Sequence, residues 1–86
     1  MKHAGAVALD RLEPVLARLR ALPALKEKAR GTFYVKNRAF LHFHEDPAGL
    51  FADVRAHDGP DFERVRVESE DEREALMARV EDYLLP

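Results

Sequence analysis

Residues 32–44, TFYVKNRAFLHFH, alternate apolar with polar side chains and are rich in aromatic and branched types. A period of two is typical of a β-strand with one buried face, and residues 36–38 interrupt it where a turn is expected. Similar runs continue to Val67, so we predict a four-stranded antiparallel meander. The strands are expected at residues 32–36, 39–44, 50–55 and 63–68, with turns at 46–49 and 58–61.

Helical periodicity flanks this meander on both sides. Pro23 ends the first helix, and Pro14 leaves two possibilities: the helix begins near Glu13, or residues 4–12 form a kinked extension. Ser69 and Glu72 form a capping box before the second helix, and residues 24–30 are expected as a basic linker. The two apolar stripes consist of Val7, Leu9, Leu12, Val15, Leu16, Leu19 and Leu22, and of Leu76, Met77, Val80, Tyr83 and Leu84.

The composition predicts one domain, residues 1–86, with an α+β fold in the order α-β-β-β-β-α and both helices on one face of the sheet. The chain is 47% apolar and 35% charged, which suits one small core with a solvated surface. It has no cysteine, no leader-like segment and no apolar run of membrane length, so we expect a cytoplasmic protein. Few thermolabile residues and an excess of arginine over lysine suggest a heat-adapted source.

The alternation assigns side chains to two faces of the sheet. The apolar face should pack on the helices, and it stays together only if the loop at residues 36–38 has an odd length. A four-residue turn at residues 46–49 then places His42 opposite Asp53, and Asp53 opposite Arg66. The apolar face holds Phe33, Val35, Ala39, Leu41, Phe43, Leu50, Ala52, Val54, Val65 and Val67. The other face holds Tyr34, Lys36, Phe40, His42, His44, Phe51, Asp53, Arg55, Arg64, Arg66 and Glu68.

Two helices leave this second face uncovered, and two interpretations follow. It could be an ordinary polar surface with cross-strand charge pairs. Three aromatic side chains, Tyr34, Phe40 and Phe51, favour instead an interaction module that forms a homodimer face to face. The candidate binding face consists of Tyr34, Phe40, His42, His44, Phe51, Asp53, Arg55 and Arg66.

A divalent metal site is the alternative function. His42 and His44 project from one face of a strand, and Asp53 would be a third ligand for zinc or another first-row ion, with hydrolytic chemistry as one use of it. Glu45, Asp46 or His57 could also complete the set. The only serine is assigned to a helix cap and no cysteine nucleophile exists. We therefore expect a binding module rather than an enzyme, with no cofactor other than such a metal.

Nucleic-acid binding on the same face is a lesser alternative. Aromatic side chains interleave with Lys36, Arg55, Arg64 and Arg66, as in sheets that stack bases and contact phosphates. The face also carries Asp53 and Glu68, and the formal net charge is −2. Nucleic acid is therefore not an expected partner.

The stretch Phe33 to Asp46 resembles the central hairpin of two groups of small bacterial proteins, the MmcQ/YjbR-like group and the group carrying the so-called luciferase domain. The hairpin runs into a His-x-His end and a short acidic turn, and the resemblance covers about residues 31–55. It implies an α+β fold with helices packed on an antiparallel sheet. It implies no reaction.

Overall fold

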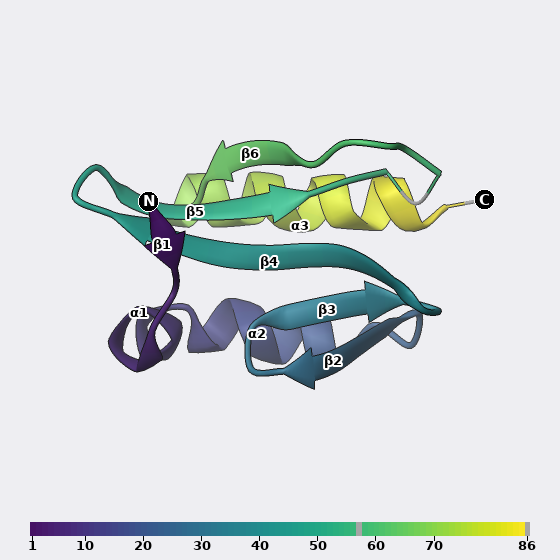
Figure 1. Ribbon diagram of the computed structural model, residues 1–86, viewed down its shortest axis with the longest axis horizontal. Helices are drawn as coiled ribbons and strands as arrows, with labels where there is room; N and C mark the ends of the chain where they lie inside the picture. The colour runs from purple at the N-terminus through teal and green to yellow at the C-terminus, as the bar shows by residue number, and fades with distance from the viewer. Residues whose placement is uncertain (57, 86) are drawn as a thin grey trace.

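The structure is a computed structural model that describes residues 1–56 and 58–85. It shows an α+β fold in which one antiparallel sheet lies against three helices (Figure 1). The elements are β1 (Lys2–His3), α1 (Ala6–Arg11), α2 (Glu13–Arg20), β2 (Leu25–Ala29), β3 (Thr32–Val35), β4 (Arg38–Asp46), β5 (Gly49–Val54), β6 (Glu63–Arg66) and α3 (Glu70–Leu84). No helix within the described residues is long and apolar enough to cross a membrane.

The sheet has the order β2-β3-β4-β5-β6, and β1 is added to β4. The four expected strands are present as β3 to β6 and form the expected meander. The predicted order α-β-β-β-β-α lacked β1 and β2, which make the sheet six-stranded. Strand β4 is the longest, with β5 along one edge. Its other edge pairs first with β3 and then with the two residues of β1, through the register pairs Lys2↔Glu45 and His3↔His44. Strand β1 therefore occupies the same edge of β4 as β3, beyond the point where β3 ends.

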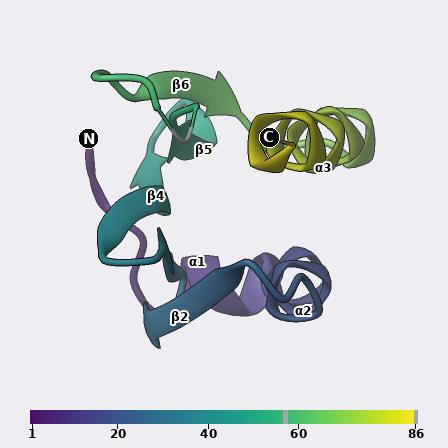
Figure 2. The ribbon, with the colours of Figure 1, turned by 90° about the vertical axis from the view of Figure 1, so that its right-hand side faces the viewer.

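The helices all lie on one side of the curved strand layer, as expected (Figure 2). The N-terminal apolar stripe forms two short helices, because the helix is interrupted at Leu12, two residues before Pro14. Both possibilities are met in part, because α2 begins at Glu13 and residues 6–11 form a separate helical segment before it. Five stripe residues are buried, but Val7 is 77% exposed, so this member of the predicted apolar stripe lies outside the core. Helix α3 begins at the predicted capping box of Ser69 and Glu72.

Residues 25–29 form strand β2 on the outer edge of the sheet, so their interpretation as a linker was wrong. The sequence LKEKA lacks the branched and aromatic residues that mark strands. Pairing with β3 stabilises this strand although its local strand propensity is low. Gly31, at a φ of +80°, provides a left-handed residue within the two-residue connection to β3. The lysines suit an exposed edge because they discourage pairing with other chains.

The hairpin between β3 and β4 differs from the prediction in the position of its extra residue. Val35 pairs with Arg38, so the loop has two residues rather than three, and the odd residue is instead a β-bulge between the pairs Phe33↔Leu41 and Tyr34↔Ala39. The extra residue in the bulge is Phe40, which is 1% exposed and belongs to the core. Strict alternation places Phe40 on the open face and Ala39 in the core. The bulge reverses both assignments.

Candidate metal centre

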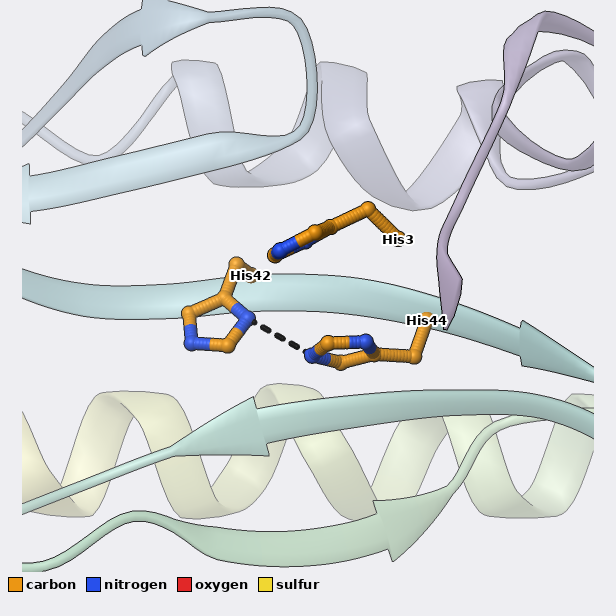
Figure 3. A group of neighbouring side chains, drawn as sticks. All are labelled: His3, His42 and His44. Atoms are coloured by element: carbon orange, nitrogen blue, oxygen red, sulfur yellow. Dashed lines mark hydrogen bonds between the residues drawn. The ribbon is translucent and has the colours of Figure 1, made fainter. Parts of the chain in front are cut away.

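The face of the sheet opposite the helices carries a cluster of imidazole rings (Figure 3). His42 and His44 alternate with core residues along β4, so both project from this face. His3 on β1 pairs directly with His44 and brings a third ring to the same place. The His3 and His44 rings stack with centroids 4.7 Å apart, and the His42 and His44 rings meet edge to face at 4.9 Å.

The nitrogen atoms of these rings converge. His44 Nε2 lies 3.0 Å from His42 Nδ1, and one potential ligand atom from each of the three histidines lies within 4.8 Å of the others. The three side chains differ in exposure: His3 is exposed, His42 is half-buried and His44 is 9% exposed. His3 therefore has the freedom to move toward the other two, which the sheet holds in place.

A buried carboxylate borders the cluster. Asp53 on β5 pairs with His42, as predicted, and its Oδ2 lies 3.1 Å from His44 Nε2. Asp53 is 7% exposed, and Arg64 on β6 donates two hydrogen bonds of 2.8 Å to its two oxygens. These bonds from Arg64 hold the pKa of Asp53 below its usual range. The carboxylate is therefore ionised and fixed in orientation.

His42 is held in the neutral form by its surroundings. Burial is the main cause that lowers its pKa below the ordinary value of 6.5, and the negative charge of Asp53 only partly opposes this. The Phe62 ring packs against the His42 ring with centroids 4.8 Å apart. A neutral imidazole has a free lone pair, which is the form that a metal ion binds.

The hydrogen bonding around His44 favours a cation at this point. Its Nε2 lies 3.1 Å from Asp53 Oδ2 and 3.0 Å from His42 Nδ1, and the tautomers of the two rings decide which nitrogen donates in the second contact. The other nitrogen, Nδ1, is buried without a hydrogen-bond partner in the described part of the chain. Ligation of a metal through Nε2 requires the proton on Nδ1, and in that tautomer the Nε2 lone pair faces the carboxylate oxygen while the buried Nδ1–H has no partner among the described residues. A cation bound to Nε2 would relieve the first of these two costs but not the second. A metal ion held by His42 Nδ1 and His44 Nε2 would accept both lone pairs, and the charge of the nearby Asp53 carboxylate would stabilise it.

The spacing suits a small ion. Zinc bonds of about 2.0–2.1 Å to nitrogen imply tetrahedral ligand-to-ligand distances of about 3.3 Å. The 3.0 Å contact between His44 Nε2 and His42 Nδ1 is within about 0.3 Å of that value. The ligand atoms of all three histidines lie within 4.8 Å of one another, so His3 has to approach the other two for all three to bind one ion. The residues present thus offer three imidazoles and a nearby carboxylate, a donor set that suits zinc, copper, nickel or iron.

The structure brings together all three residues of the predicted metal set, His42, His44 and Asp53. The cation beside Asp53 is Arg64, however, and not Arg66 as predicted. Arg66 pairs across from Phe51 and lies 3.3 Å from Glu72. The error is a shift of two residues, which keeps every side chain on its predicted face, so alternation alone could not detect it.

Other members of the predicted binding face are dispersed. Phe40 lies in the core, and the half-buried Tyr34 ring has the Lys28 ammonium 4.3 Å above it. Arg55 lies over Phe62 at 4.4 Å and donates to the carbonyl of Ala39. Phe51 is half-buried opposite His44.

Sequence reasoning missed His3 because no pattern connected it with residues forty positions away. The pairing of β1 with β4 is the only reason it joins the cluster. Of the other suggested ligands, Glu45 accepts the Gly5 amide at 2.6 Å, and Asp46 accepts the Ala48 amide at 3.0 Å. His57 lies outside the described residues.

No family model, curated protein or solved structure matches this chain.

Proposed function

We propose that this protein binds one divalent first-row transition-metal ion through His3, His42 and His44. The observation that carries the proposal is the convergence of three imidazoles from two strands, with ligand atoms within 4.8 Å of one another. Surface histidines that act independently have no reason to meet in this way. The proposal adds His3 to the predicted pair, and it leaves Asp53 beside the ion.

The electrostatics of the cluster support this function. Burial keeps His42 neutral, so no proton has to be removed from it at neutral pH. Asp53 contributes a negative charge that Arg64 largely balances, so the carboxylate orients and stabilises the centre without creating an uncompensated buried charge. Three protein nitrogens leave a tetrahedral ion one further position for water or another small ligand.

The direct test is calorimetric titration of Zn²⁺ into protein that carries no histidine tag, since a tag would bind metal itself. We expect one saturable equivalent per chain. His42→Ala and His44→Ala should each weaken binding at least about tenfold. Tyr34→Ala is the matched control, because it removes a half-buried ring from the same face without removing a ligand.

Two results would remove the proposal. One is the absence of saturable Zn²⁺ binding by folded protein at neutral pH. The other is stoichiometric binding that survives the double substitution His42→Ala/His44→Ala, because the ion would then be held elsewhere. Circular dichroism of each variant shows whether the fold is intact.

A further inference from the structure

The first strand is attached to the rest of the protein by few contacts. Lys2 and His3 are both exposed, and β1 is only two residues long. It is attached by the pairing with β4, by the Ala4 amide donating to Phe43 O at 3.1 Å, by the Gly5 amide donating to Glu45 and by the stacking of His3 on His44. Two longer ion pairs, from the N-terminus to Asp46 at 3.7 Å and from Lys2 to Glu45 at 3.8 Å, add to these contacts. Segments with little buried apolar area and exposed hydrogen bonds open at low free-energy cost.

The candidate metal centre spans this weakly attached element and the centre of the sheet. His3 belongs to β1, whereas His42 and His44 belong to β4. An ion held by all three side chains would connect residue 3 to residues 42 and 44 directly. It would thus cross-link the two strands beyond the backbone pairing that already joins them.

We propose that metal binding at this centre locks β1 onto β4, so that the metal controls whether the edge of β4 near residues 43–45 is covered. This inference rests on the proposed metal-binding function and adds a regulated element to it. When β1 is detached, Phe43 O loses the Ala4 donor and the β4 edge beyond β3 has no partner strand. An uncovered edge of this kind is a template for pairing with other chains.

The coupling follows from thermodynamic linkage. A metal that binds three histidines when β1 is attached, and two when it is detached, has a higher affinity for the attached form. It must therefore shift the equilibrium toward attachment by the ratio of the two affinities. The loss of affinity caused by His3→Ala and the gain in attachment caused by metal measure the same quantity.

Hydrogen exchange of the Ala4 and Gly5 amides, followed by NMR, reads this equilibrium without any assay of activity. With saturating Zn²⁺ we expect both amides to exchange about tenfold more slowly, or slower still, than in the metal-free protein. The amide of Val67, which donates to Leu50 O at 2.8 Å away from β1, serves as the internal reference. In His3→Ala the zinc-dependent slowing should disappear.

Lys2→Ala is the matched control on the same strand. Its ion pair with Glu45 spans 3.8 Å and the lysine side chain is 79% exposed, so its loss should leave the zinc-dependent slowing intact. Zinc bound at His42 and His44 without slower exchange at Ala4 and Gly5 would overturn this inference and leave the proposed function standing. Equal slowing in His3→Ala would also overturn it. Absence of zinc binding would overturn both.

Discussion

Arg64 holds Asp53 by two parallel hydrogen bonds, from Nε to Oδ1 and from Nη2 to Oδ2, each 2.8 Å long. The two residues lie opposite each other on neighbouring strands β6 and β5. The same carboxylate faces His44 at 3.1 Å. This pair therefore connects the edge of the sheet to the histidine cluster, and it is the natural place to test how the cluster is supported.

Asp53→Asn should destabilise the protein and weaken metal binding together. The variant replaces one hydrogen-bond acceptor by an NH₂ group that faces the Arg64 donors. We expect the free energy of unfolding to fall by about 1–2 kcal/mol. This is at the lower end of the range for hydrogen bonds to charged groups, because the Arg64 side chain is 48% exposed and water screens the interaction. We expect zinc affinity to fall at least about tenfold. Urea denaturation of the metal-free protein and zinc calorimetry measure the two effects.

The exposed Asp82 provides the control for this experiment. Asp82→Asn makes the same chemical change away from the cluster and should alter neither quantity beyond about 0.5 kcal/mol. Unchanged stability and zinc affinity in Asp53→Asn would show that the carboxylate has no role in the centre.

Phe40 and Phe51 should respond very differently to truncation, although the alternation pattern places them together. Phe40 is 1% exposed in the core, so Phe40→Ala should lower the free energy of unfolding by about 3–5 kcal/mol. Phe51 is half-buried on the open face, and Phe51→Ala should cost clearly less. Urea denaturation distinguishes the two cases. Equal losses would contradict the bulge at Phe40.

The difference in burial between Phe40 and Phe51 determines which substitution can test self-association. Homodimer formation through the open face stays a prediction, and Phe40→Asp cannot test it because a buried charge would unfold the protein. Phe51→Asp is the suitable variant. If the face forms a dimer, sedimentation should show the native chain as a dimer and Phe51→Asp as a monomer. A native monomer at the concentrations tested would remove this prediction.

Lys36→Gly should stabilise the hairpin between β3 and β4. Lys36 has a φ of 56°, in the left-handed region that strains a residue with a side chain. Glycine adopts this conformation without strain, so we expect a gain of about 0.5 kcal/mol in the free energy of unfolding, after its greater freedom in the unfolded chain is subtracted. Asn37→Gly is the control and should not stabilise, because Asn37 is outside that region. Thermal denaturation of both variants measures the difference.

Glu27→Gln should remove stability in a pH-dependent way. Glu27 on β2 accepts a hydrogen bond of 2.6 Å from Arg20 and one of 2.9 Å from the Gly31 amide. The bond from Arg20 is the main cause that lowers the pKa of Glu27 below 4.5. Because the folded-state pKa is depressed, this stability is present above pH 4.5 and is lost as the pH falls through the folded-state value.

We therefore expect Glu27→Gln to be about 1 kcal/mol less stable than the native protein near pH 7, and the difference to shrink below pH 4.5. Urea denaturation across this pH range measures it. In an Arg20→Gln background the pH-dependent part should largely vanish. A difference that is constant with pH would show that Glu27 acts through packing alone.

Local signals in the sequence predicted much of the fold. The period of two located four strands, the turn at residues 46–49 set the pairing of His42 with Asp53, and the capping box located the start of α3. Each of these depends on neighbouring residues or on one short turn. The heat-adapted source, the cytoplasmic location and the resemblance to known hairpin families are expectations that the fold does not test.

The remaining features depend on residues that are distant in the chain. Strand β2 forms because β3 is available to pair with it, although its own propensity is low. The bulge at Phe40 forms because the core accepts that ring, and the pairing of Asp53 with Arg64 depends on how a long connection closes. Alternation determines which face a side chain occupies, but it leaves shifts of two residues undecided.

The candidate centre shows the same division. The sequence by itself determined that His42, His44 and Asp53 share a face, because they occupy alternate positions on two strands joined by a short turn. Only the tertiary structure decided that His3 joins them and that Arg64 orients the carboxylate. Those contacts come from pairing between segments far apart in sequence, whose partner and register depend on the free energy of the whole sheet rather than on any local pattern.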